Sequence, residues 1–417
     1  MKSRKITFID LFAGCGGLSE GFLQSKQYEA LAHIEWETPM VETLRARLVS
    51  NWNHSPEEAT KRVIHFDIQR TEELISGNWG ADAVALYSGT NHATVIDKGL
   101  KGLVGSRKVD LIIGGPPCQA YSIAGRAQDK DSMKNDYRNY MFESFVKVVQ
   151  QFNPDAFIFE NVPGLLSACP GGIPVTQRIF EAFRRIGYEI RVPELLKKSV
   201  FSASDFGVPQ KRSRVIIIGV RTNSALSLET LYREIDSLRD KSIPKTIRDA
   251  ISELPKFKPL ERMVRQNGEN VSHGLVGLVE VKHHRARFHN KRDIGIFEQW
   301  IKGNMNRGTT ASKVAFYNKT IGKRSNHAKY RSLVWDQPSP TIVAHLYKDG
   351  LMFIHPDVQQ ARSITVKEAA LLQSFPDDYE FIGSQGHCFK MIGNAVPPQM
   401  AKHIAIAVQK GLADNGN

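Results

Sequence analysis

The sequence contains few cysteines and no long apolar run, and both absences narrow the class of protein. Its four cysteines are far apart and include no Cys-x-x-Cys pair, so neither a zinc site nor a disulfide framework is indicated; they are Cys15, Cys118, Cys169 and Cys388. No apolar run is long enough to span a membrane, and the first residues lead directly into a strand rather than forming a signal peptide. We therefore expect a cytoplasmic protein that binds no metal.

Acidic residues are scarce in one window, and this absence points to a polyanionic partner. The chain carries 56 Lys and Arg against 43 Asp and Glu, a formal net charge of +13. Residues 281–330 alone hold twelve basic and two acidic side chains. Such clustering is the electrostatic footprint of a nucleic-acid-binding face, whereas a merely solvated surface does not require the acids to be nearly absent.

The order of apolar runs predicts an α/β fold. Five short runs read as buried strands and are interleaved with helical patterns, which favours a parallel sheet covered by helices; the runs cover residues 5–12, 28–34, 63–66, 109–113 and 155–159. The α/β rhythm stops near residue 222 and regular structure returns after residue 330. We therefore expect three segments: 1–221 and 331–417 form one domain, and 222–330 form a smaller, irregular one. Residues 77–108 show no clean period and read as an insertion or long loop.

Residues suited to a cofactor follow the first three strands. Gly14 and Gly16 form a turn between a strand and a helix, which is the layout of a nucleotide-type cofactor site. Glu35 ends the second strand, and a carboxylate about 20 residues past such a turn typically accepts hydrogen bonds from ribose hydroxyls. Trp36 offers a flat face for an adenine, and Asp67 ends the third strand. A surface carboxylate and a core tryptophan remain the alternative for Glu35 and Trp36.

The other two strands end in residues suited to covalent and acid catalysis. Gly-Gly-Pro-Pro at residues 114–117 cannot continue a strand ladder, so the chain turns and Cys118 lies at the ligand-binding edge of the sheet. A lone cysteine is more often a small buried hydrophobe, but this position favours a nucleophile. Glu160 ends the next apolar strand. Arg212 and Arg214 point to the same side of an extended segment, where arginines bind anionic or carbonyl oxygens.

Five motifs resemble, in order, those of the C5-cytosine DNA methyltransferases of bacterial restriction–modification systems. They are Asp10-Leu-Phe-Ala-Gly-Cys-Gly-Gly, Pro116-Pro-Cys-Gln, Glu160-Asn-Val, Gln210-Lys-Arg-Ser-Arg and Gly393-Asn-Ala-Val-Pro-Pro. The resemblance covers nearly the whole chain and includes a variable domain between the last two motifs. It implies a Rossmann-like, S-adenosylmethionine-dependent methyltransferase sheet with a target-recognition domain at 222–330.

The resemblance also assigns chemical roles. Cys118 is the thiolate that adds to C6 of cytosine and makes C5 nucleophilic, and Glu160 is the acid at N3. Arg214 contacts the cytosine, while Arg212 helps to position Glu160 and the Cys118 loop. Because C5 is buried in a duplex, the base must be flipped out.

Cofactor and partners follow from the same resemblance. S-adenosylmethionine, converted to S-adenosylhomocysteine, is expected to contact Phe12, Gly14, Gly16, Glu35, Trp36, Asp67, Pro116, Asn394 and Val396. Double-stranded DNA is expected to contact Gln119, Ser122, Arg285, Arg287, Lys291 and Arg292. We expect a monomer that acts on the nucleoid and is paired in function, without direct contact, with a restriction endonuclease.

Two departures from the family pattern and three rival functions remain. The segment between Asp67 and Cys118 is longer than usual, and Ala120-Tyr121-Ser122 replaces the family's common Gly-Phe-Ser. The rivals are an RNA cytosine methyltransferase acting on tRNA, an inactive DNA-binding relative and a thiol hydrolase. Intact Cys118, Glu160 and Arg214 argue against the second, and no histidine at a comparable strand end argues against the third. The DNA sequence recognised cannot be read from the chain.

Overall fold

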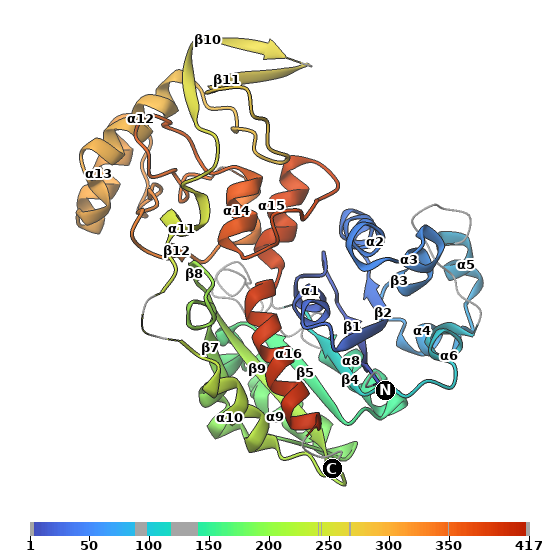
Figure 1. The fold of residues 1–417 in the computed structure, drawn as a ribbon. Helices are drawn as coiled ribbons and strands as arrows, with labels where there is room; N and C mark the ends of the chain where they lie inside the picture. Colours follow the sequence, from blue (N-terminus) through green and yellow to red (C-terminus); the bar gives the residue numbers. More distant parts are fainter. Residues whose placement is uncertain are drawn as a thin grey trace. The chain divides into compact units, whose positions relative to one another are not determined.

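The chain divides into two compact units. The computed structural model describes residues 4–87, 98–117, 141–240, 242, 244–266, 268–348 and 350–413 (Figure 1). Unit 1 comprises Met1–Gly207, Arg212–Lys241 and Ala395–Asn417, and unit 2 comprises Val208–Lys211 and Ser242–Asn394. This division differs from the expected boundaries at 222 and 330, because α10 (Leu228–Ser237) packs on α16 (Pro398–Ala413) of unit 1 and because residues 331–394 belong to unit 2.

Unit 1 is built on a mostly parallel sheet, as the sequence predicts. Its strand order is β3-β2-β1-β4-β5-β9-β6, and β7 pairs with β9. The five strands from β3 to β5 are parallel to one another, whereas β9 runs antiparallel to β5, β6 and β7. The bounds are β1 Ile6–Leu11, β2 Tyr28–Glu35, β3 Val63–His65, β4 Leu111–Gly114, β5 Ala156–Asn161, β6 Tyr188–Ile190, β7 Val200–Ser202 and β9 Ser213–Arg221.

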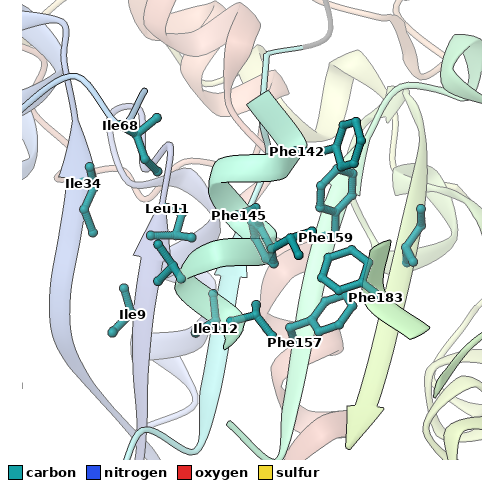
Figure 2. Packing of buried hydrophobic residues seen from close by; sticks show 14 of the residues in the cluster. Ile9, Leu11, Ile34, Ile68, Ile112, Phe142, Phe145, Phe157, Phe159 and Phe183 are labelled. Atoms are coloured by element: carbon teal, nitrogen blue, oxygen red, sulfur yellow. The ribbon is translucent and has the colours of Figure 1, made fainter. Parts of the chain in front are cut away.

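An aromatic core covers one face of the sheet (Figure 2). Phe145 packs edge-on against Phe157 and Phe159, and Phe183 stacks on Phe157 with ring centroids 4.0 Å apart. The helices of this layer are α4 (Thr71–Ser76), α6 (Gly99–Val104), α8 (Met141–Phe152) and α9 (Val175–Arg185). The described part of the expected 77–108 loop therefore contains regular structure, namely α5 (Ala81–Tyr87) and α6, and α6 contributes Leu100 and Val104 to the core.

The opposite face is covered by α1 (Gly17–Gln24), α10 and α16. Phe8 of β1 contacts Phe22 of α1 with centroids 5.8 Å apart, and the Tyr28 hydroxyl donates to the Ala405 carbonyl at 2.8 Å. A Cβ on Gly21 would lie 2.5 Å from the Ala401 Cβ, so glycine is required where α1 crosses α16. The C-terminal helix thus completes a three-layer sandwich. The helices α2 (Thr38–Trp52) and α3 (Pro56–Arg62) connect β2 to β3.

Unit 2 is less regular. It contains a two-stranded hairpin, β10 (Phe257–Gln266) and β11 (Glu269–Leu275), and a short parallel pair, β8 (Gln210–Lys211) with β12 (Ser339–Pro340). Its α-helices are α11 (Ile247–Ile251), α12 (Lys291–Lys302), α13 (Thr310–Ile321), α14 (Val366–Leu372) and α15 (Gln385–Asn394). Ile296, Phe297 and Trp300 of α12 form a small apolar core with Tyr330 and Ile354.

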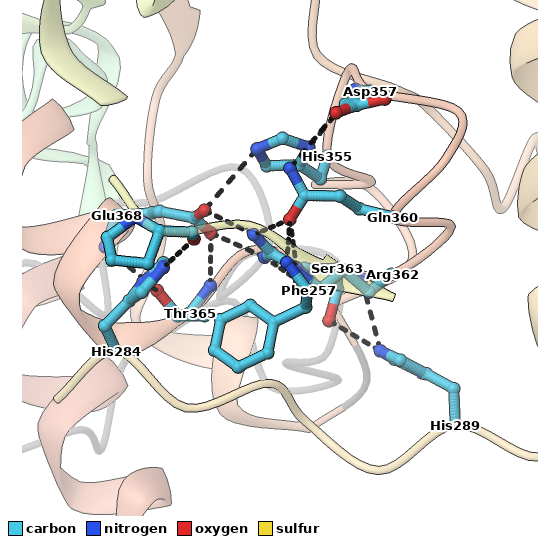
Figure 3. Close-up of polar contacts among 11 residues, drawn as sticks. Phe257, His284, His289, His355, Asp357, Gln360, Arg362, Ser363, Thr365 and Glu368 are labelled. Carbon is cyan, nitrogen blue, oxygen red and sulfur yellow. Dashed lines mark hydrogen bonds and ion pairs between the residues drawn. The ribbon is translucent and has the colours of Figure 1, made fainter. Parts of the chain in front are cut away.

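A buried polar network joins the segments of unit 2 (Figure 3). The Arg362 guanidinium donates to both oxygens of Glu368, at 2.6 and 2.8 Å, and to the side-chain oxygen of Gln360. Burial alone would raise the pKa of Glu368, but Arg362 and His355 hold it well below its usual range. The Ser363 N–H donates to Nε2 of His289 at 3.1 Å, which requires that nitrogen to be unprotonated.

Because His273 and His289 are buried in the neutral form, unit 2 is expected to be sensitive to acid. Burial lowers the pKa of His289 to about 3 and that of His273 to about 4, from the usual 6.5. The unfolded chain therefore binds more protons, so stability that is present above pH 6.5 is lost as the pH falls towards these values. The loss is about 2 kcal/mol per histidine at pH 5. Hydrogen exchange at pH 7 and pH 5, corrected for the intrinsic rate, should show α14 losing protection before β1. Equal changes in both would contradict this expectation.

Candidate active site at the carboxyl edge of the sheet

The strand register brings the predicted residues to one edge of the unit 1 sheet. Leu11 pairs with Ile34 on one side and with Gly114 on the other, and Gly114 pairs with Phe159. The residues that follow these positions are Phe12, Glu35, Gly115 and Glu160. They lie side by side at the carboxyl end of the parallel strands, which is where ligands bind in open α/β sheets.

The turn after β1 is conformationally strained. Phe12, Gly14 and Gly16 all have left-handed backbones, with φ of 58°, 58° and 87°. Glycine adopts this conformation freely, whereas for Phe12 it costs on the order of 1–3 kcal/mol, and such strain is concentrated at functional sites. A Cβ on Gly17 would lie 2.5 Å from the Val396 carbonyl oxygen. The last motif therefore lies against the Gly-rich turn through Val396.

Glu35 ties the end of β2 to this turn. Its carboxylate accepts hydrogen bonds from the backbone N–H groups of Gly14 at 2.8 Å, Trp36 at 2.8 Å and Glu37 at 2.9 Å. Burial raises the pKa of the carboxyl, and these three donors act in the opposite direction. A carboxylate has about four acceptor positions, so one remains for a ribose hydroxyl.

The neighbouring residues fit the adenosine part of a cofactor. The Trp36 side chain is 58% exposed, so a face of the indole is open for stacking. Asp67 follows β3 and forms a turn in which its Oδ1 accepts from the Gln69 N–H at 3.0 Å. The three residues predicted to contact adenosine thus lie at the ends of two adjacent strands, because β2 pairs with β3. Glu35 and Trp36 are at the end of β2, and Asp67 comes after β3.

A close ion pair lies at the end of β5. Glu160 Oε1 and Arg214 Nε are 2.6 Å apart, and both side chains are largely buried. Arg214 also donates from Nη1 to the Ser213 carbonyl at 2.8 Å. The pair combines a carboxyl group with a cationic donor, a combination that suits a substrate that develops charge on a ring nitrogen and a carbonyl oxygen.

This pair is held against the start of the Cys118 loop. A Cβ on Gly115 would lie 2.6 Å from Glu160 Oε2, so a larger residue at this position would displace the carboxylate from its present place. The Asn161 side-chain amide donates to the Pro116 carbonyl at 3.2 Å and accepts from the Val162 N–H at 2.9 Å. Asn161, which sequence reasoning did not assign, therefore fixes Pro116 to β5; its presence in the Glu160-Asn-Val motif was the available signal.

Arg212 is buried, and its Nη2 donates to the Ala395 carbonyl at 2.9 Å. The sequence assigned Arg212 to positioning Glu160 and Arg214 to contacting cytosine. In the structure Arg214 is the ion-pair partner of Glu160, and Arg212 connects the Gln-Lys-Arg-Ser-Arg motif to the last motif.

Asn394 is the last residue of α15 and belongs to unit 2; its place in the cofactor pocket remains a prediction. Cys118, Gln119 and Ser122 lie outside the described residues.

The four basic residues expected to touch DNA have different surroundings. Arg285 pairs with Glu269 at 2.8 Å, Arg292 with Asp293 at 3.1 Å, and Lys291 is the exposed first residue of α12. Arg287 donates to the carbonyls of Leu346 at 2.7 Å and Tyr347 at 2.9 Å, and its guanidinium lies over the Phe389 ring. Arg287 therefore binds the backbone of unit 2 at residues 346–347.

Within the described ranges, no group of three or more His, Cys, Asp or Glu side chains is arranged to hold a metal ion. A search of the same residues finds no helix long and apolar enough to cross a membrane.

The fold and the site together define an α/β protein whose parallel strands end in a Gly-rich turn bonded to Glu35 and in a carboxylate–arginine pair. The sequence model of the C-5 cytosine-specific DNA methylase family matches residues 6–78 and 71–410. The chain belongs to this family, whose members are S-adenosylmethionine-dependent. It is a DNA cytosine methyltransferase of the restriction–modification type.

Curated relatives match over almost the whole chain. The type II methyltransferase M.Bpa9945I of Bacillus paralicheniformis is 36% identical, with 96% of this chain and 98% of the relative covered. M.AgeI of Thalassovita gelatinovora is 30% identical, with 97% and 99% covered. Among solved structures, an E. coli prophage-encoded chain described as a DNA modification methyltransferase has a TM-score of 0.62 at 21% identity, with 98% of this chain and all of that chain covered. That structural likeness supports the fold.

Proposed function

We propose that this enzyme methylates C5 of a flipped cytosine in a specific duplex sequence, using S-adenosylmethionine and a covalent adduct to Cys118. The observation that carries the proposal is the Glu160–Arg214 pair, held by Gly115 and Asn161 against the first residues of the Cys118 loop. This arrangement supports the proposal that an acid and a cationic donor act beside the segment that leads to Cys118.

The residues would act in sequence. The Cys118 thiolate forms a bond to C6 while N3 takes a proton from Glu160, and a donor from Arg214 stabilises the charge on O2. The ring is then an enamine whose C5 is nucleophilic. S-adenosylmethionine, when bound, supplies the electrophilic methyl group. A base then removes the C5 proton, the Cys118–C6 bond breaks with release of the thiolate, N3 returns its proton to Glu160, and aromaticity returns.

The cofactor pocket would lie between the Gly-rich turn and the ends of β2 and β3. Glu35 would accept from the ribose, Trp36 would pack against the adenine and Asp67 would accept from its amino group, while Phe12, Pro116 and Val396 would line the pocket. Three hydrogen bonds already hold the Glu35 carboxylate, so the ribose acceptor is oriented before the cofactor binds.

Protection of host DNA from a cognate restriction endonuclease is the biological role that we propose, with the enzyme acting as a monomer on the nucleoid. The type II methyltransferase names of its relatives support this role.

Methyl transfer to different nucleic acids tests the proposal. With labelled S-adenosylmethionine, we expect incorporation into unmethylated duplex DNA and none into tRNA, and bisulfite sequencing should locate the label at one cytosine in a short recurring sequence. Incorporation into tRNA alone would favour the RNA methyltransferase alternative. DNA binding without any incorporation would favour the inactive relative.

A further inference from the structure

The β10–β11 hairpin extends away from the helices of unit 2 (Figure 1). The last six residues of β10 are exposed, and these include the apolar Met263 and Val264, which are 47% and 42% exposed. A two-stranded hairpin is marginally stable alone in water, and exposed apolar side chains at its end carry a cost. A binding partner that covers the exposed end of the hairpin would remove this cost.

The base of the hairpin is fixed by the buried network of unit 2 (Figure 3). The Phe257 N–H donates to the Gln360 side-chain oxygen at 3.1 Å, and the Arg362 guanidinium lies 5.1 Å from the centre of the Phe257 ring. On the other strand, the Ser272 hydroxyl accepts from the His289 N–H at 2.9 Å. The hairpin therefore projects from a rigid base, which is the arrangement expected of a recognition element.

An unusually wide bulge interrupts the hairpin. Pro259 pairs with His273 and Val264 pairs with Val271, so the four residues 260–263 lie opposite the single residue Ser272. Bulges bend a strand and redirect its side chains, and they are common next to functional sites. This bulge carries Arg262, for which no hydrogen bond or ion pair to another described residue is found.

Two arginines of this strand are suited to reading bases. Arg262 and Arg265 are both exposed; Arg265 donates from Nε to the Gly268 carbonyl at 3.2 Å, and its terminal nitrogens make no hydrogen bond to another described residue. The DNA major groove admits a two-stranded ribbon, and bidentate contact of arginine with guanine is the commonest base-specific contact there.

A different stretch of unit 2 is suited to the phosphate backbone. Residues 299–335 contain eight Lys and Arg and no Asp or Glu. Lys313 and Lys319 of α13 and Lys323 just beyond it belong to this stretch. The hairpin, in contrast, mixes Arg262 and Arg265 with Glu261 and Glu269. Phosphate contacts need only positive charge and position the protein, whereas base contacts specify the sequence.

From this contrast we propose that the β10–β11 hairpin is the base-reading element of the enzyme and that it enters the major groove with Arg262 and Arg265 at base edges. The proposal rests on the proposed function. It assigns recognition of the DNA sequence to the β10–β11 hairpin rather than to unit 2 as a whole.

The test compares single variants on a library of duplex sites. Arg262→Ala and Arg265→Ala should each relax the preferred base at one position of the methylated sequence, reducing discrimination there about 5- to 150-fold. Arg262→Lys and Arg265→Lys, which keep the charge but lose the planar bidentate donor, should behave like the alanine variants. Thermal unfolding should be unchanged because both side chains are exposed.

The control variant Lys313→Gln/Lys319→Gln/Lys323→Gln should leave the preferred sequence unaltered. It should weaken binding to all sequences and make the slope of log affinity against log salt shallower by about 0.9 per lost phosphate contact. The proposal would be overturned if the arginine variants bound all sequences more weakly but kept the wild-type sequence preference. It would also be overturned if these variants behaved like the wild-type enzyme. Failure of wild-type enzyme to methylate any duplex would instead refute the proposed function.

Discussion

Cys118→Ala is expected to abolish methyl transfer, with a loss of at least about a thousandfold, while duplex binding and S-adenosylmethionine binding change only a few-fold. The thiolate is needed to break the aromaticity of the cytosine ring, and removal of a covalent nucleophile typically costs orders of magnitude in rate. Docking of DNA and cofactor depends on other residues. The affinities can be measured by calorimetry on the same preparation that is used for single-turnover transfer.

A substrate analogue provides the matching positive test. DNA with 5-fluorocytosine at the target position cannot lose the C5 substituent as a proton, so wild-type enzyme should remain covalently attached and survive denaturing electrophoresis. The Cys118→Ala variant should form no such adduct. Residual transfer above about 1% of wild type would contradict a nucleophilic role, given the size of effect expected.

The parallel sheet could be predicted because parallel strands buried on both faces read as continuous apolar runs. In a parallel sheet the strand ends must also meet at one edge, so Glu35 and Glu160 were assigned to the same site although 125 positions separate them in the chain. The register of β1, β2, β4 and β5 confirms that inference about the sheet. Only local patterns and a topological rule were required.

Unit 2 could not be predicted in the same way, because beside its small apolar core its segments are joined by a buried polar network with no periodicity. Phe257, His289 and Arg362 come from distant segments, and their hydrogen bonds to Gln360 and Ser363 leave no signal in a one-dimensional pattern. Charge alone was also ambiguous. Arg287 belongs to the basic window, yet its guanidinium binds two backbone carbonyls. In unit 1, short helices such as α6, with six residues, were missed because they are too brief to show a helical period.

The arginines of the catalytic edge illustrate a similar limit. Alternation along an extended segment places Arg212 and Arg214 on one side, but it does not assign a partner to either. The partners depend on the antiparallel pairing of β5 with β9, in which Asn161 lies opposite Val215. That pairing brings Arg214 to Glu160. The carboxylate at the end of β5 therefore pairs with an arginine of β9, the neighbouring strand that runs antiparallel to β5.

Glu160→Gln is expected to lower the rate of methyl transfer by about 100- to 10,000-fold, which is the range for removal of a general acid or base. Glutamine has nearly the same shape and still accepts from Arg214 Nε, so the site should remain intact. It cannot deliver a proton to N3, and the negative charge that develops on the ring during thiolate addition is left without its acid. The KM values for DNA and cofactor should stay within about threefold, since the lost proton transfer stabilises only the transition state.

The control is Glu189→Gln, which removes an exposed carboxylate from β6 of the same sheet and should leave the rate unchanged. Gly115→Ala provides an independent steric test, because its Cβ would lie 2.6 Å from Glu160 Oε2 and displace the carboxylate without altering its chemistry. A rate loss for Gly115→Ala, with unaltered cofactor affinity, would assign the effect to the position of Glu160. If Glu160→Gln instead raises KM at constant kcat, Glu160 binds the cytosine equally in the ground and transition states, and another group must supply the proton at N3.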